Sequence, residues 1–181
     1  MLNFFTQAEE IVERVHPDCN LKEILSCDQY SNGVYRVATS EGDRIIKVNP
    51  GDSSRLTIYF ENEVRALMLL RGLPYTPELE GTTREEEWVA LEKDYVEGQT
   101  LEENPSALYS INDAQRLVGL IHQRGVCHLD LKRKSNWLVN QGGFWLFDFD
   151  VAKFREDLGE RRFKNRMKED IHHLLTSHYT T

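Results

Sequence analysis

The hydrophobic positions in the first fifty residues follow a helical spacing and then a strand spacing. Residues 6–15 place their apolar side chains on one side of a short helix, which a proline ends two residues later. Residues 21–25 predict a short strand. Residues 34–39 and 44–48 are rich in β-branched side chains, and the turn at 41–43 between them predicts a hairpin.

Residues 56–71 return to helical spacing with a wide apolar face. Gly72 and Pro74 end this predicted helix. Residues 78–83 and 88–96 then predict a second antiparallel pair of strands. The apolar positions of the helix are Leu56, Phe60, Val64, Leu67, Met68 and Leu70. The first half of the chain therefore reads as sheet, helix and sheet.

The second half of the chain is more helical. Asn112 is predicted to begin a helix, with Gln115 three residues later completing a capping box, and Gly125 supplies its C-terminal stop. A second helix is predicted from about residue 155 to the end of the chain. Its apolar positions are Phe163, Met167, Ile171, Leu174 and Leu175.

The composition is that of a globular protein. The 181 residues favour one compact domain or two small lobes that share a core, and 40% of them are hydrophobic. The formal net charge of −8 argues against a dedicated nucleic-acid binder, which needs a basic surface. Cys19, Cys27 and Cys127 are widely spaced and form no C-x-x-C pair, which argues against a disulfide framework and a zinc site.

The charge is uneven along the chain. Residues 151–181 hold seven basic and five acidic side chains, a net charge of +2 on an acidic protein. Such a basic end suits an anionic substrate or membrane surface, or simply a solvated helix face. We see no signal peptide and no apolar run long enough to span a bilayer, so we expect a soluble, cytoplasmic protein.

The polar chemistry gathers in residues 127–150. Asp130 and Asn136 lie in an irregular polar stretch, 128–136, that precedes a predicted tight hairpin. Asp148 follows the hairpin, which returns the chain to its starting point and so brings the three side chains together, with Lys132 among them. Phosphoryl transfer needs hard oxygen ligands for Mg²⁺, a carboxylate that orients the attacking hydroxyl, and a cation.

This segment, CHLDLKRKSNWLVNQGGFWLFDFD, resembles the catalytic segment of the protein-kinase-like superfamily, whose pattern is H-x-D-x-K-x-x-N, a hairpin, then D-F-G. The resemblance implies that Asp130 is the catalytic base or the positioner of the substrate hydroxyl. It makes Asn136 and Asp148 the magnesium ligands. Lys132 would face the γ-phosphate, and His128 would brace the loop.

The first half supplies the other parts that the resemblance requires. Lys47, in the frame Ile45-Ile46-Lys47-Val48, looks like the strand lysine of the V-A-I-K motif. It would hold the α- and β-phosphates of ATP. Glu63 on the next helix is similar to the glutamate that orients this lysine in the family. Glu61 is a competing candidate.

Two further segments resemble nucleotide-contacting parts of the family. Residues 30–37 resemble the nucleotide loop and second strand, although only Gly33 remains of the usual G-x-G-x-x-G. Residues 94–98 resemble the hinge between the lobes, where the backbone groups of Asp94 and Val96 would meet adenine. The resemblance runs from about residue 21 to residue 153.

The sequence departs from typical protein kinases near the metal ligands. The spacing from Asp130 to Asn136 is one residue longer than usual, so Ser135 and Asn136 both remain candidate ligands. The D-F-G motif is D-F-D here. Asp150 therefore either assists metal binding or caps a helix that begins at Ala152.

The truncated end of the chain suggests a narrower relative. Residues 128–153 look like the bacterial lipopolysaccharide-core kinases, especially those that phosphorylate a sugar hydroxyl of 3-deoxy-D-manno-octulosonic acid (Kdo) on lipid A at the cytoplasmic face of the inner membrane. The basic run 161–166 fits that acceptor. Minimal kinases of the RIO type also have small C-lobes.

The resemblance implies an α+β, bilobal protein-kinase-like fold with a truncated helical C-lobe. Residues 1–93 would form an N-lobe of antiparallel sheet plus one helix, and residues 94–181 a short C-lobe with the catalytic loop. The expected function is transfer of the γ-phosphate from Mg-ATP to a sugar hydroxyl of a lipopolysaccharide-type glycolipid. A small Ser/Thr protein kinase acting on protein substrates, and a pseudokinase-like binding module, are the alternatives.

Overall fold

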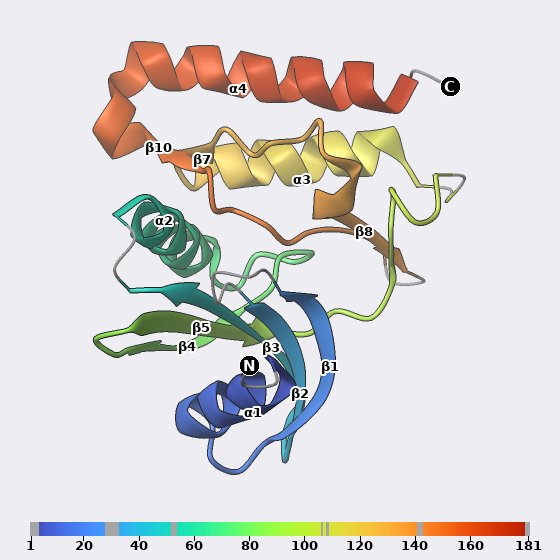
Figure 1. Cartoon of the computed structure of the whole chain (residues 1–181). Coiled ribbons are helices and arrows are strands. Elements are labelled where there is room, and N and C mark those ends of the chain that lie inside the picture. Colours follow the sequence, from blue (N-terminus) through green and yellow to red (C-terminus); the bar gives the residue numbers. More distant parts are fainter. Residues whose placement is uncertain are drawn as a thin grey trace. The chain divides into compact units, whose positions relative to one another are not determined.

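The computed structural model describes residues 4–27, 33–51, 54–105, 107, 109–140 and 143–179 (Figure 1). It shows a mixed α+β chain whose sheets are antiparallel. The chain divides into two compact units. The first unit comprises Met1–Val64 and Leu79–Tyr95, and the second comprises Arg65–Glu78 and Val96–Thr181.

The described part of the first unit is built on one antiparallel sheet with the strand order β1-β2-β3-β5-β4. The pairs β1-β2, β2-β3 and β4-β5 join strands that are consecutive in the chain, whereas α2 separates β3 from β4 and β3 pairs with β5. Its elements are α1 (Phe4–Val15), β1 (Asn20–Cys27), β2 (Gly33–Thr39), β3 (Gly42–Pro50), the N-terminal part of α2 (Ser54–Leu70), β4 (Leu79–Arg84) and β5 (Trp88–Asp94).

The two faces of this sheet bury different clusters. Ile11 and Val12 of α1 pack with side chains of β2, β3 and β5, among them Ile46. On α2, Phe60 packs instead with Val89 and Leu91 of β5. Because successive strand residues point to opposite faces, every second residue of β3 and β5 faces α2.

The second unit is mostly helical in its described part. The helices α3 and α4 lie side by side, and α4 bends at Gly159 (Figure 1). Two small antiparallel sheets complete the unit, β10-β7 and β6-β8-β9. Its elements are β6 (Gln99–Thr100), α3 (Ile111–Gln123), β7 (Val126–Cys127), the 3-10 turn η1 (Lys134–Asn136), β8 (Trp137–Asn140), β9 (Gly143–Leu146), β10 (Lys153–Phe154) and α4 (Arg155–Tyr179). Among the described residues, no helix is both long and apolar enough to cross a membrane.

The predicted elements are present, with small corrections at their ends. The start of α3 was predicted wrongly: Ser110, not Asn112, is the N-cap, and its side chain accepts a hydrogen bond from the Asp113 N–H. The predicted apolar face of α2 includes Met68, which is exposed, because α2 buries a narrower stripe. No helix begins at Ala152, since a short strand precedes α4, so Asp150 caps no helix there.

Candidate functional site

A buried ion-pair triad lies on the α2 face of the first sheet. Lys47 on β3 and Lys93 on β5 both point toward α2 and contact the Glu63 carboxylate, with N–O distances of 2.6 Å and 2.5 Å. The strand register explains the meeting, because Lys93 lies opposite Ile45, two residues from Lys47. Side chains at such diagonal positions are neighbours on one face.

The Glu63 carboxylate is fully buried, and its pKa is set by burial and by the two lysines. Burial alone would raise its pKa, but the opposing charges and hydrogen bonds of Lys47 and Lys93 outweigh burial and hold the pKa at about 2. Glu63 is therefore ionised at every pH at which the protein is expected to work. The two lysines differ in access, since the Lys47 side chain is 18% exposed and that of Lys93 only 6%.

The geometry separates the two glutamates that were candidates for the Lys47 partner. Glu61 is exposed and lies 3.3 Å from Arg84, whereas Glu63 contacts Lys47. Lys93 was not predicted as part of the site. A signal for it exists in the sequence, because it is a charged residue that continues the alternation of Val89 and Leu91, the buried side chains of β5 that face α2.

The loop at 128–136 has an unusual backbone in the second unit. His128 and Asp130 have positive φ angles of 59° and 47°, a left-handed conformation that is strained for side chains other than glycine. The loop is fixed by internal hydrogen bonds. Arg133 N–H donates to the Asp130 carbonyl at 3.0 Å, and the Trp137 indole donates to the Leu131 carbonyl at 3.2 Å.

Asp170 of α4 forms hydrogen bonds with the backbone at the start of this loop. Its carboxylate accepts the backbone N–H groups of His128 and Leu129, at 2.8 Å and 3.0 Å, and contacts the His122 ring of α3 at 2.9 Å. Asp170 is 2% exposed, so its charge is compensated by these partners. Asp170 was not predictable from the sequence, because its partners lie more than forty residues away.

Two titratable groups beside the loop are poor candidates for chemistry. Burial, chiefly, raises the pKa of the Cys127 thiol to about 12, so the thiolate that a nucleophile or metal ligand requires is scarce. Burial also lowers the pKa of His128, with a further contribution from Arg166. Its backbone N–H holds the loop through Asp170, so the bracing role expected of His128 falls at least partly to the main chain.

The β8–β9 hairpin brings Asn136 next to Phe147, which immediately precedes Asp148. Trp137 pairs with Leu146 across β8 and β9, and the Phe147 N–H points to the Asn136 carbonyl at 3.4 Å. Asp148 accepts a long hydrogen bond of 3.4 Å from the Asp150 N–H. The middle of the predicted turn, 141–142, lies outside the described residues.

Asp130 and Lys132 lie in the same loop but in different environments. The Asp130 carboxylate is largely buried, and its Oδ2 contacts the Arg133 guanidinium at 2.8 Å. Its Oδ1 has no hydrogen-bond partner among the described residues. Lys132 is exposed. Arg133 was not predicted as part of the site, although it lies only three residues after Asp130 in the sequence.

The remaining predicted residues lie at strand ends. Gly33 begins β2 opposite Val48, next to Lys47 on β3. Asp94 ends β5 in the first unit, and its carboxylate accepts a hydrogen bond from Arg44 at 2.9 Å. Val96 is half-buried in the second unit. The predicted nucleotide-loop residues 30–32 lie outside the described residues.

Asn136 and Asp148 are the residues predicted to bind magnesium. Asn136 is 6% exposed, and no described residue hydrogen-bonds its side-chain amide. No three His, Cys, Asp or Glu side chains cluster as a metal site in the described parts of the chain. Magnesium characteristically binds one or two protein oxygens and completes its shell with phosphates and water, so Asn136 and Asp148 suit it.

The sequence matches no model of a known protein family and no curated protein.

Proposed function

We propose that this protein is a Mg-ATP-dependent phosphotransferase with a protein-kinase-like, bilobal fold, and that it phosphorylates a hydroxyl group. The observation that carries the proposal is the Lys47–Glu63 ion pair, in which a fully buried carboxylate holds a partly exposed strand lysine. A kinase-like catalytic segment, as proposed for residues 127–150, works together with a strand lysine that a glutamate holds in position. Lys47 remains partly exposed and can therefore reach a phosphate, whereas Lys93 is buried and fits a structural role.

The roles follow from the chemistry of each residue. Lys47 binds the α- and β-phosphates, and Glu63 keeps it in position. Asp130 accepts the proton of the acceptor hydroxyl through Oδ1, while Arg133 fixes its other oxygen. The hydroxyl oxygen forms a bond to the γ-phosphorus, and the bond from that phosphorus to the bridging oxygen breaks, which releases ADP. Gly33, Asp94 and Val96 are proposed to contact the nucleotide.

Asn136 and Asp148 are the proposed magnesium ligands. The lack of a protein partner for the buried Asn136 amide supports Asn136 over Ser135, whose side chain is more exposed. Bound magnesium would neutralise charge on the phosphates as it develops. Asp150 is retained as an additional carboxylate beside the metal ligands, since it caps no helix at Ala152.

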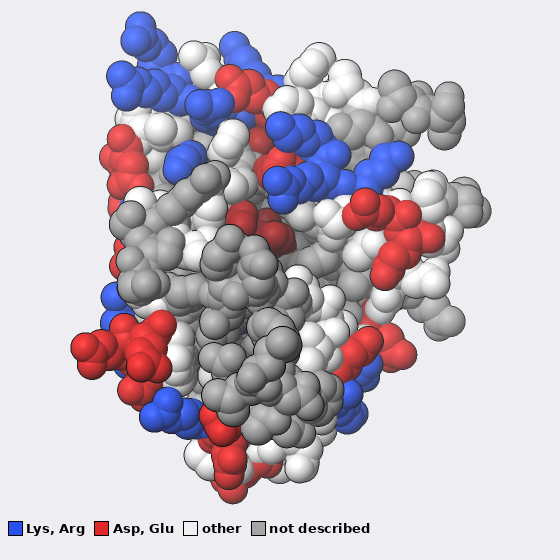
Figure 2. Space-filling view, in the orientation of Figure 1, with Lys and Arg blue, Asp and Glu red and all other residues white. Residues whose placement is uncertain are grey.

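The basic surface of α4 supports an anionic acceptor. Five basic residues in this helix are exposed, and no acidic residue interrupts them: Arg161, Arg162, Lys164, Arg166 and Lys168. Lys and Arg side chains gather over α4 at the top of Figure 2. We propose that the acceptor is a sugar of a lipopolysaccharide-core glycolipid, met at the cytoplasmic face of the inner membrane. Exposed Lys132, two residues after Asp130, favours a protein hydroxyl as the second candidate.

The nucleotide half of the proposal is tested by measuring ATP binding in the presence of Mg²⁺. We expect ATP to raise the thermal unfolding midpoint of the full chain, as any ligand that binds only the folded state does. Lys47→Met should abolish this shift and Lys93→Met should retain it, although both lysines contact Glu63. Equal loss in the two variants, or no ATP-dependent shift in the native chain, would count against the assigned roles.

The transfer half is tested with γ-labelled ATP and two acceptors, Kdo-lipid A and a mixture of Ser- and Thr-containing proteins. Label is expected in the glycolipid and is expected to fall by roughly 10³-fold in Asp130→Asn, since a positioned base contributes about 10²–10⁴-fold. Glu160→Gln, an exposed acid of α4, is the control. Label in protein alone would replace the sugar acceptor with a protein one. ATP binding without transfer to either would leave a binding module.

A further inference from the structure

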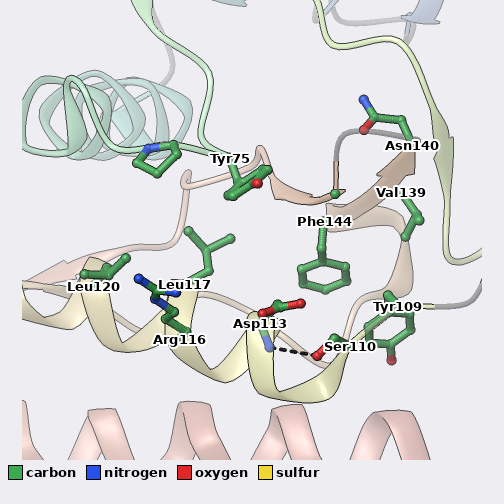
Figure 3. A pocket seen from close by; sticks show the side chains of 12 residues that line it. Tyr75, Tyr109, Ser110, Asp113, Arg116, Leu117, Leu120, Val139, Asn140 and Phe144 are labelled. Atoms are coloured by element: carbon green, nitrogen blue, oxygen red, sulfur yellow. Dashed lines mark hydrogen bonds between the residues drawn. The ribbon is translucent and has the colours of Figure 1, made fainter.

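A cavity of about 460 Å³ lies within the second unit (Figure 3). One wall is the first three turns of α3, and the opposite wall is formed by Tyr75 and the β8–β9 hairpin. Small-molecule sites in proteins typically measure about 300–1,000 Å³, so the space suits a small organic ligand. None of its lining residues has a role in the proposed phosphotransfer.

The aromatic side chains of the lining pack against other rings. The ring of Phe144 stacks on Tyr109 at 4.8 Å and packs against Trp137 at 4.3 Å. Across the cavity, Tyr75 meets the ring of Trp145 edge-on at 5.7 Å. Preformed aromatic walls of this kind bind flat apolar groups without ordering flexible side chains.

Tyr75 lines the cavity from a backbone conformation that is unfavourable for a side chain of its size. Its φ angle is 66°, and its carbonyl accepts the Leu146 N–H at 3.1 Å. A Cβ added to Gly143 would lie 2.7 Å from the Tyr75 ring, so glycine allows this close approach. Tyr75 is nevertheless 40% exposed. An exposed aromatic side chain at a strained position is a feature that functional sites commonly show.

Two opposite charges line the same cavity on α3. Asp113 and Arg116 are three residues apart and therefore lie on one face of the helix. Residues at this spacing often pair, yet neither forms an ion pair with the other or with any other described residue. Figure 3 shows both beneath Tyr75 and Phe144, with the Asp113 backbone N–H bonded to Ser110.

We propose that this cavity is a binding site for a zwitterionic small molecule with an aromatic body, of the chemical kind that an aromatic amino acid presents. The ammonium group pairs with Asp113, the carboxylate pairs with Arg116, and the ring lies against Tyr75 and Phe144. A ligand with a single charge would leave one of the two side chains unmatched. This site is separate from the proposed phosphotransfer site and does not depend on it.

Three probes that share an indole ring and differ in their charged group test this assignment: tryptophan, tryptamine and indole-3-propionate. Binding to the full chain is measured by titration calorimetry and by ligand-observed NMR. Tryptophan is expected to bind saturably and most tightly. The cationic and anionic probes should each bind more weakly, because each can satisfy only one of the two charges.

Two substitutions assign the contacts. Asp113→Asn should weaken tryptophan and tryptamine about tenfold and leave indole-3-propionate unchanged, because one charge-assisted hydrogen bond is worth about that factor. Arg116→Gln should weaken tryptophan and indole-3-propionate and leave tryptamine unchanged. Glu86→Gln and Arg14→Gln, exposed residues outside the cavity, are the matched controls. Circular dichroism verifies that each variant is folded.

The crossed pattern is the result that supports the site. The proposal is overturned if no probe saturates below about 10 mM. It is also overturned if tryptophan binds equally well to both α3 variants and the native chain. Because the measurement is direct binding without ATP, its failure leaves the phosphotransfer proposal untouched, and the absence of phosphotransfer leaves this site untouched.

Discussion

Glu63 joins Lys47 and Lys93 in one buried ion-pair triad of the first unit. Changing Glu63→Gln would leave Lys47 and Lys93 with an uncharged neighbour in a buried site. We expect the free energy of unfolding to fall by about 3–5 kcal/mol, the usual loss when one partner of a buried ion pair is removed. Urea denaturation measures this change.

The control for that experiment lies two residues away on the same helix. Glu61 pairs with Arg84 on the surface, so Glu61→Gln removes the same charge but should change the free energy of unfolding by less than about 1 kcal/mol. Equal losses in the two variants would mean that the buried triad contributes no more to stability than a surface pair.

The depressed pKa of Glu63 also predicts how stability depends on pH. The pKa is about 2 in the folded chain and 4.5 as its reference value, so the folded state favours the ionised form. This contribution, roughly 3 kcal/mol, is complete above pH 4.5 and is lost as the pH falls toward 2. Unfolding curves between pH 2 and 6 should show a steeper acid decline for the native chain than for Glu63→Gln.

Among single residues, the sequence allowed some assignments and not others. The pairing of Lys47 with Glu63 was predictable, because a strand lysine followed by a glutamate on the next helix resembles a motif of the protein-kinase-like superfamily. Lys93 and Asp170 were not, because their roles depend on strand register and on contacts between distant segments. Asn136 was predictable only in part. The sequence left Ser135 and Asn136 as alternative metal ligands, and only the structure shows that Asn136 is the buried one.

At the scale of elements, the start of α3 provides a matched pair of substitutions. Ser110 accepts the Asp113 N–H at the N-cap, whereas Asn112 is an exposed residue in the first turn. Ser110→Ala should lower the free energy of unfolding by about 1 kcal/mol. Asn112→Ala should change it little, and a larger loss there than at Ser110 would reverse the cap assignment. Thermal or urea unfolding distinguishes the two.

The helices and strands themselves were largely predictable, because their hydrophobic periods are strong. Positions 34–39 and 44–48 are rich in β-branched side chains, and β2 and β3 form there. Helix ends were less predictable, since a cap is decided by a few local hydrogen bonds. The short strand β10 was missed because its pairing partner, β7, lies more than twenty residues earlier.

At the scale of the whole molecule, the charge is strongly polarised. The chain carries a net charge of −8, but α4 exposes an uninterrupted basic run. We predict retention on a heparin column at low salt, and loss of retention as salt screens the surface. The combined change Arg161→Gln, Arg162→Gln and Lys168→Gln should abolish it.

A scattered substitution with the same change in net charge is the control for this surface. Arg14, Arg71 and Arg84 are exposed at separate places in the chain, and replacing all three with Gln should leave retention nearly intact. Equal loss in the two triple variants would show that total charge governs binding. The sequence alone indicated the charge asymmetry, but only the structure shows which of these cations are exposed on one helix.

Asp170 has a consequence for the time scale on which the loop at 128–136 opens. Backbone amides in loops without regular structure usually exchange with deuterium quickly, because local opening exposes them. The amides of His128 and Leu129 instead donate to the buried carboxylate of Asp170 on α4. They can exchange only when that contact breaks, so they should exchange at the slow rate of the helix. The first two residues of an irregular loop would then be among the last backbone sites of the second unit to exchange.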